Sequence, residues 1–185
     1  KHHGRGNFIR RPDERIRYDN QRLFSPHPAP AEAELHVHVS VHRVAAVGTL
    51  PALLQVRDGA PLTEYVYTSH RNDITQSLAY VYVPRAVARL GTPTGNLSPW
   101  GDDIRTLLAN AGVHVVSTRE RLTTRLPSSD DVRLLRTTTP VLVIERTSID
   151  TTGRVAEGAL LVLPGDRTEA VFTTFTPAVA LEVAE

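Results

Sequence analysis

Histidines at alternate positions are the first residues of this chain that suggest chemistry. His36, His38 and His42 fall on one side of an alternating run that begins at Glu34. Imidazoles spaced two apart on one strand face are able to ligate a metal ion, but such a site needs a further ligand from another segment. The neighbouring sequence supplies none. The pattern therefore favours a half-solvated strand face, and no metal site is expected.

Paired carboxylates are the second candidate, because two neighbouring acids are able to divide the roles of general acid and general base. The chain has two such pairs, Asp102-Asp103 and Asp130-Asp131. Each stands at the start of an expected helix, where capping of free backbone N–H groups explains it without catalysis. The sequence has no cysteine, and no nucleophile motif or phosphate-binding loop occurs in it. No catalytic residue and no cofactor are therefore predicted.

Tyrosines and arginines gather on three expected strand faces. Tyr65, Tyr67 and Ser69 share a face of strand 62–71, and Tyr80 and Tyr82 share a face of strand 77–84, with a turn at Asn72-Asp73 between the two strands. The tyrosines suit either a sheet surface or the wall of a pocket for a polar organic ligand, and the pattern leaves both open. Arg119, Arg121 and Arg125 alternate along strand 113–126. A solvated basic face is the default there, and contact with an anion is the alternative.

An internal repeat organises the elements that carry these residues. Thr68-Ser69 and Thr147-Ser148 are 79 residues apart, and a Leu-Leu pair precedes each of the two β-rich stretches. Each copy reads as a short helix followed by a hairpin, which is too small to bury its own apolar face. We expect the copies to pack back to back, with a ligand cleft where they meet. Ser128 or Ser129 is expected to cap the second helix, and a last hairpin is expected over 155–175.

Composition limits the classes of protein that remain. The formal net charge of +1 argues against a general polyanion binder. No apolar run approaches membrane-spanning length, so we expect a cytoplasmic protein without membrane contact. Residues 1–12 are basic and glycine-kinked, and they read either as a cloning scar or frayed arm, or as the last strand of a DNA-contacting wing. Residues 13–33 are rich in charge and proline and are predicted to be a linker. Residues 34–185 remain as one α+β domain.

Several short motifs, taken in order, resemble one family of bacterial regulators. His3-Gly4-Arg5-Gly6-Asn7-Phe8-Ile9 is similar to the end of the winged helix-turn-helix of GntR-type regulators. Asp58-Gly59-Ala60-Pro61 and 80–84 resemble the first half of the UTRA effector domain of their HutC branch. Residues 104–108, 139–146, Ala156-Glu157 and Gly165-Asp166-Arg167 resemble its second half. The resemblance covers essentially the whole chain.

The resemblance implies a fold, a function and partners. The fold is an antiparallel β-sheet with helices and an internal repeat, as in chorismate lyase. The function is that of a ligand-responsive transcriptional regulator, a repressor and not an enzyme, which binds operator DNA as a homodimer through a domain that precedes Lys1. Gly4, Arg5 and Gly6 are the expected DNA contacts. The alternatives are a small enzyme of the chorismate-lyase-like fold and a stand-alone ligand-binding module.

The resemblance also implies an effector site with an unusual lining. Relatives that bind phosphosugars hold the phosphate with two arginines, and those positions match Tyr67 and Ser69 here. A serine at the start of the central helix matches Asp103, which repels an anion. Glu157 matches the acidic ligand contact of the family, and an aromatic position has become Leu163. The expected effector is therefore a neutral or cationic organic molecule rather than a phosphosugar.

Overall fold

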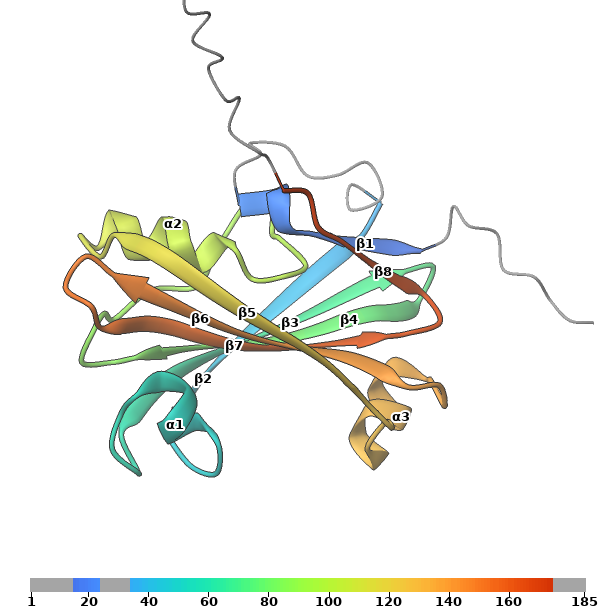
Figure 1. Ribbon diagram of the computed structural model, residues 1–185, viewed down its shortest axis with the longest axis horizontal. Coiled ribbons are helices and arrows are strands. Elements are labelled where there is room, and N and C mark those ends of the chain that lie inside the picture. The colour runs from blue at the N-terminus through green and yellow to red at the C-terminus, as the bar shows by residue number, and fades with distance from the viewer. Residues whose placement is uncertain (1–14, 24–33, 175–185) are drawn as a thin grey trace, which may run out of the picture.

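A six-stranded antiparallel sheet forms the frame of the protein in the computed structural model, which describes residues 15–23 and 34–174 (Figure 1). The strand order is β2-β3-β4-β7-β6-β5, and a separate pair joins β1 to β8. The strands are β1 (Ile16–Asp19), β2 (His36–Ala45), β3 (Pro61–Arg71), β4 (Ile74–Pro84), β5 (Val115–Arg125), β6 (Val141–Asp150), β7 (Val155–Pro164) and β8 (Thr168–Val171). The helices are α1 (Leu50–Leu54), α2 (Asp103–Asn110) and α3 (Ser129–Leu135), with a 3-10 turn η2 (Asn20–Leu23). The predicted α+β class with an antiparallel sheet is confirmed.

The two faces of the sheet carry different elements, because side chains alternate between the faces along each strand. Helix α2, the β1–β8 pair and the fully buried Trp100 cover one face, and α1 and α3 lie against the other (Figure 1). Tyr65 and Tyr67 are completely buried on the α2 face, so these two tyrosines belong to the core rather than to an exposed surface. Tyr80 and Tyr82 point to the opposite face, toward α1 and α3.

The internal repeat is visible as two matching units, α1-β3-β4 and α3-β6-β7. The units do not pack back to back as expected. They lie side by side in one sheet, because β4 of the first unit pairs with β7 of the second. Each helix then crosses to the other unit, with α1 packed on β7 and α3 packed on β4. Gly158 of β7 permits this crossing, since a Cβ there would lie 2.8 Å from Leu54 of α1.

The local signals for turns and caps give a mixed result. Asn72 and Asp73 both adopt positive φ between β3 and β4, as a tight two-residue hairpin turn requires. Ser128 caps α3 in a capping box with Asp131, which confirms that prediction. The carboxylates at the start of α2 were also expected to cap, and that prediction is wrong. Asp102 makes no side-chain cap there, because it accepts hydrogen bonds from Arg146 and Ser98 instead.

The segment before the sheet is more structured than a linker. Within the range 13–33, residues 16–19 form β1, which pairs in parallel with β8. Ile16 and Tyr18 are both fully buried, and this apolar alternation explains why the strand binds the sheet. The linker prediction therefore does not describe residues 15–23. The prediction of a hairpin over 155–175 is also wrong, because β8 does not pair with β7 but pairs with β1.

The histidine-bearing strand lies at one edge of the sheet. His36, His38 and His42 are exposed, while Val37 and Val39 on the opposite side are partly buried against the core. The strand is therefore half-solvated, as its pattern predicts. Among the described helices, none is long and apolar enough to cross a membrane.

Candidate functional site

Three of the predicted site residues converge on the α2 face of the sheet. Tyr67 comes from β3, Asp103 from the first turn of α2, and Glu157 from β7. Burial raises the pKa of Tyr67, and the nearby charges of Asp103 and Glu157 raise it further. All three groups are therefore close enough to interact, although they come from both halves of the repeat.

An arginine that was not predicted sits at the centre of this group. Arg146 of β6 is completely buried, and its Nε lies 2.9 Å from Oε1 of Glu157. Its Nη1 lies 2.6 Å from Oδ1 of Asp102, at the start of α2. Burial lowers the pKa of Arg146, but the charges of Glu157 and Asp102 outweigh that effect and raise it. The guanidinium therefore stays charged and ties the sheet to the helix.

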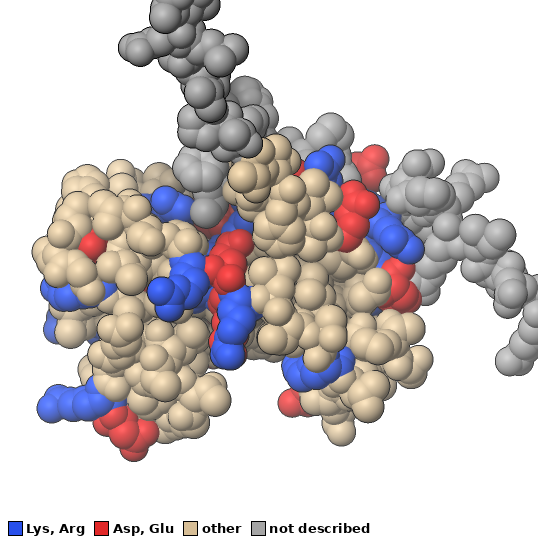
Figure 2. All heavy atoms as spheres, in the orientation of Figure 1, with Lys and Arg blue, Asp and Glu red and all other residues tan. Residues whose placement is uncertain are grey.

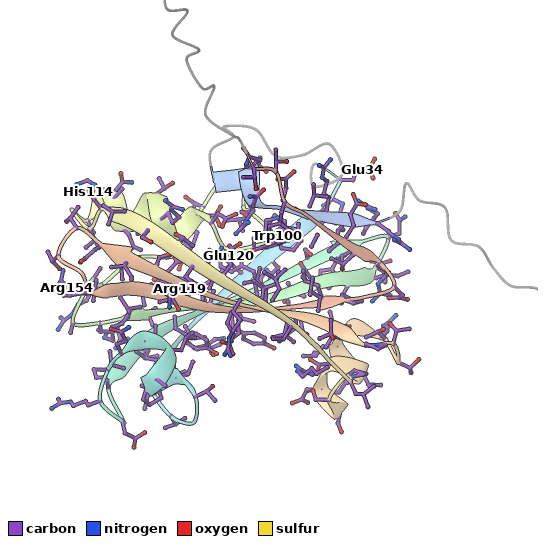
Figure 3. All side chains as sticks on the ribbon, viewed as in Figure 1. Glu34, Trp100, His114, Arg119, Glu120 and Arg154 are labelled. Atoms are coloured by element: carbon purple, nitrogen blue, oxygen red, sulfur yellow. The ribbon has the colours of Figure 1, made fainter. Side chains whose placement is uncertain are left out.

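The segment before the sheet closes the site from outside. Arg22 of η2 lies over the ring of Tyr18, 4.1 Å from its centroid, and forms ion pairs with Asp102 and Glu120. The Tyr18 hydroxyl donates to Glu120 at 2.7 Å, and its ring meets Trp100 edge to face. Figure 3 labels Glu120 and Trp100, which lie on the side of the sheet that carries β1 and α2.

These residues form one connected group, called the buried polar cluster below. It consists of Tyr18, Arg22, Tyr67, Asp102, Asp103, Glu120, Arg146 and Glu157. The cluster contains four carboxylic acids against two guanidiniums. Burial raises the pKa of Asp103, and the adjacent charge of Asp102 adds to that effect, although a backbone bond from Ser98 opposes it.

Several polar atoms of the cluster have no hydrogen-bond partner among the described residues. Arg146 Nη2 is a free donor and Glu157 Oε2 is a free acceptor, and both atoms are buried. The Tyr67 hydroxyl and Asp103 Oδ2 also lack a hydrogen bond of good geometry, although the charge of Asp103 acts on Tyr67. Buried polar groups are nearly always paired, and leaving one unpaired costs roughly 1–3 kcal/mol. Unpaired donors and acceptors side by side therefore suit a polar ligand.

The other two predicted effector contacts lie outside the cluster, elsewhere on the α2 face of the sheet. Ser69 is two residues beyond Tyr67 on the same face of β3, is fully buried, and hydrogen-bonds to Ser77 of β4. Leu163 of β7 is fully buried in the apolar core on the α2 face. The predicted DNA contacts Gly4, Arg5 and Gly6 fall outside the described residues.

Sequence reasoning predicted three members of the cluster, Tyr67, Asp103 and Glu157, and missed the other five, namely Tyr18, Arg22, Asp102, Glu120 and Arg146. Arg146 carries a usable signal, because it alternates with Ile144 and Ser148 on the inward side of a strand. A charged residue at an inward position is rarely left unpaired. Arg22 carries no such signal, since the sequence does not indicate that its segment packs against the sheet.

The buried polar cluster lies between the sheet and α2 and draws on both halves of the repeat. A comparison with protein-family models matches the UTRA domain over residues 35–169, so the chain belongs to the UTRA domain family. A comparison with curated protein sequences gives no significant match.

Solved structures share this fold at low sequence identity. PhnF from Mycobacterium smegmatis aligns with a TM-score of 0.66 and 19% identity, over 87% of this chain and 72% of that chain. The separate effector domain of PhnF aligns with a TM-score of 0.65 and 19% identity, over 87% of this chain and 100% of that one. A GntR-family transcriptional regulator from Bacillus cereus aligns with a TM-score of 0.64 and 18% identity, over 77% and 99% of the two chains. At such identities the likeness establishes the fold.

Proposed function

We propose that this chain is the effector-binding part of a GntR-type transcriptional regulator of the HutC branch, a repressor that responds to a small organic molecule. Membership of the UTRA family and the likeness to GntR-family structures support the regulatory role. The observation that carries the proposal further is the buried polar cluster, in which Arg146 Nη2 and Glu157 Oε2 have no partner in the described chain.

The chemistry of the cluster favours an effector that is cationic or rich in hydrogen-bond donors. Four carboxylic acids outnumber two guanidiniums, and both guanidiniums are already paired with carboxylates. A phosphate placed beside Asp103 and Glu157 would be repelled, because no unpaired cation in the cluster compensates its charge. An amine next to Glu157 would instead gain a charge-assisted hydrogen bond. Tyr67, Ser69, Asp103, Glu157 and Leu163 are the proposed effector contacts.

The segment 15–23 is able to couple effector binding to DNA binding. Arg22 and Tyr18 belong to the cluster and lie in the stretch that leads directly from residues 1–14 to the domain. An effector that competes for Asp102 or Glu120 would loosen that stretch. We propose that such a change repositions a preceding winged helix-turn-helix whose wing includes Gly4, Arg5 and Gly6.

Catalysis is the less favoured function. A lyase of related fold needs an arginine and a carboxylate that are both free to hold the substrate. Arg146 and Glu157 are bound to each other at 2.9 Å, and Asp102 occupies another nitrogen of the arginine. We therefore propose that the site binds an effector, which displaces existing partners within the cluster, and that it does not catalyse a reaction.

Thermal unfolding with defined probes tests the effector class. Agmatine and benzylamine at millimolar concentration should raise the melting temperature, because a ligand that binds only the folded state stabilises it. Glucosamine-6-phosphate should not. Glu157→Gln should abolish the rise, and Glu169→Gln on the exposed side of β8 should leave it intact. A rise with the phosphosugar, or an equal response in Glu157→Gln, would contradict the proposed site.

DNA binding and assembly need separate measurements. This chain should bind DNA weakly and without sequence preference, and the addition of a preceding helix-turn-helix should produce tight binding at a defined operator. Tight operator binding by the present chain would show that the DNA-reading surface is assigned wrongly. Sedimentation at micromolar concentration should give a species of twice the chain mass, since regulators of this type read paired half-sites as dimers. A clean monomer would count against the proposal.

A further inference from the structure

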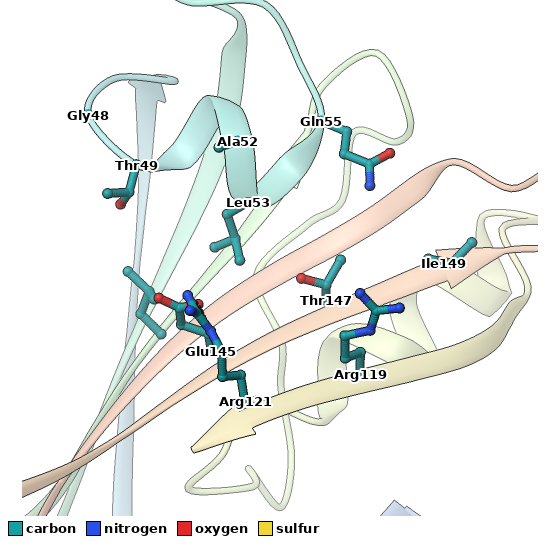
Figure 4. Close-up of a pocket in the computed structure, with 11 residues that line it drawn as sticks. Gly48, Thr49, Ala52, Leu53, Gln55, Arg119, Arg121, Glu145, Thr147 and Ile149 are labelled. Atoms are coloured by element: carbon teal, nitrogen blue, oxygen red, sulfur yellow. Dashed lines mark hydrogen bonds and ion pairs between the residues drawn. The ribbon is translucent and has the colours of Figure 1, made fainter. Parts of the chain in front are cut away.

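The face of the sheet opposite the buried polar cluster carries a second, open site. A groove of about 660 Å³ runs between α1 and the strands β5, β6 and β7 (Figure 4). Ligand pockets in proteins typically have volumes of roughly 300–1,000 Å³. The groove is lined by residues of both halves of the repeat, namely Gly48, Thr49, Ala52, Leu53, Gln55, Arg119, Arg121, Glu145, Thr147, Ile149 and Leu160. We call it the α1 groove.

The α1 groove has an apolar interior and polar groups on one side. Leu53 and Ala52 of α1 face Leu160 and Ile149 of the sheet and make an apolar interior. Arg119 lies at one side of the groove, which Thr147 of β6 and Gln55 after α1 also line (Figure 4). An apolar interior with a few polar groups on one side is the usual form of a site for a small organic molecule.

The two arginines of the groove are not equivalent. Arg121 forms an ion pair with Glu145, its cross-strand neighbour on β6. Arg119 has Thr147 as its cross-strand neighbour, and it forms no ion pair or hydrogen bond with any residue that the structure describes. Figure 2 shows basic and acidic side chains next to one another over the middle of the molecule. One guanidinium in the groove is therefore free to bind an anion.

We infer that the α1 groove binds a small organic carboxylate that has an apolar body. The planar carboxylate matches the fork of the Arg119 guanidinium, and Thr147 and Gln55, which line the same groove, would supply further donors. The hydrocarbon part would lie against Leu53 and Leu160. A phosphate ester suits the site less well, because Glu145 already neutralises the second arginine.

This site is separate from the proposed effector site but is mechanically close to it. Arg119 and Arg121 flank Glu120, and Glu145 and Thr147 flank Arg146, in the same two strands. Odd-numbered residues therefore line the groove, while their even-numbered neighbours belong to the buried polar cluster on the other face. A carboxylate in the groove is thus one layer of sheet away from the cluster.

Calorimetric titration of the whole chain with hexanoate and benzoate tests the inference. Both should bind with heat that saturates at millimolar concentration or below, and hexylamine should not. Arg119→Gln should weaken the binding of both carboxylates about tenfold or more, the effect of losing one charged hydrogen-bond partner. Arg43→Gln is the matched control, because Arg43 is an exposed arginine on β2 at the other edge of the sheet.

A second variant tests the groove by reducing its volume and leaves its charges unchanged. Ala52→Phe should fill the groove and reduce binding of benzoate more than Arg43→Gln does, with folding checked by circular dichroism. Glu169→Gln, which changes an exposed carboxylate on β8 outside both sites, should leave carboxylate binding unchanged. Absence of binding to the unmodified chain would overturn the inference, and so would equal affinity in Arg119→Gln and Arg43→Gln.

Discussion

The two halves of the repeat have matching backbones but different polar contents. In the first half, Ser69 pairs with Ser77 across β3 and β4, next to a shift in register. In the second half, Ser148 pairs with Glu157 across β6 and β7, again next to a register shift. The difference indicates that one scaffold is able to carry a neutral hydrogen bond on one side and a charged group on the other.

The charged half requires additional partners, and those partners shape the rest of the molecule. Arg146 occupies the position that Tyr67 holds in the first half, 79 residues earlier. A buried guanidinium needs carboxylates, and Glu157 and Asp102 supply them. Asp102 is thereby drawn away from helix capping and toward Arg22, which brings the segment 15–23 onto the sheet. The asymmetry between the halves thus explains why the two charged side chains that the repeat strands give to the cluster, Arg146 and Glu157, both come from the second half.

Replacing the central arginine should give the largest effect. Arg146→Met leaves Glu157 without a cation and Asp102 with Arg22 alone, and breaking a buried ion pair from one side typically costs roughly 3–5 kcal/mol. Tyr67→Phe removes only a hydroxyl that has no well-formed hydrogen bond, so it should change the free energy of unfolding by less than about 1 kcal/mol. Urea denaturation measures both. Similar losses of unfolding free energy in Arg146→Met and Tyr67→Phe would show that the charged and neutral positions of the two halves do not differ in their contribution to stability.

Replacing Gly101, which lies against β3 and β4 of the first half, should give the second largest loss of stability. Gly101 has a φ of +70°, and a Cβ there would lie 2.5 Å from Val81 and 3.0 Å from Tyr67. Gly101→Ala should therefore destabilise the protein by roughly 2–3 kcal/mol, through overpacking added to backbone strain. Gly112→Ala is the control, because its φ is +79° but nothing lies within 4 Å. Its cost should be near 1 kcal/mol, and equal costs would show that packing against β3 and β4 is loose.

The carboxylates at the starts of α2 and α3 should respond differently to pH. Burial raises the pKa of Asp103 above its ordinary value of 3.8, so the folded state favours the protonated acid. The stability that this group contributes is present at low pH and is lost as the pH rises through the folded-state pKa. Asp103→Asn keeps an oxygen for the Ser98 N–H and has no charge to bury.

Unfolding curves between pH 3 and pH 8 test this expectation. The free energy of unfolding of Asp103→Asn relative to the unmodified chain should increase as the pH rises. Asp130→Asn is the matched control at the start of α3, where the side chain is 76% exposed and pairs with Arg133. A constant difference for Asp103→Asn would mean that Asp103 ionises in the folded protein as it does in the unfolded chain.

The fold was largely predictable because it depends on local alternation, turn residues and a repeat. Asn72-Asp73, the Ser128 cap and the matched helix-hairpin units are all readable from neighbouring residues. The arrangement of the units was not, because pairing of β4 with β7 joins segments about 80 residues apart. Only three of the eight cluster residues were predicted, for the same reason. Glu157, Tyr67 and Asp103 came from resemblance, whereas Arg22 reaches Asp102 and Glu120 only through long-range packing.

The first half, in which a neutral Ser69–Ser77 hydrogen bond joins β3 and β4, gives the prediction with the smallest expected change in stability. Ser69 and Ser77 are both fully buried and hydrogen-bond to each other across β3 and β4. Ser69→Ala should destabilise the protein by roughly 1 kcal/mol, because it leaves the Ser77 hydroxyl buried without that partner. The double variant Ser69→Ala/Ser77→Ala should cost less than the sum of the two single variants, since both polar groups are then gone. In the charged half, Ser148→Ala should cost more than Ser69→Ala, because it removes a donor to the Glu157 carboxylate. Urea denaturation of the four variants decides the comparison, and a smaller cost for Ser148→Ala would indicate that Glu157 is held by Arg146 alone.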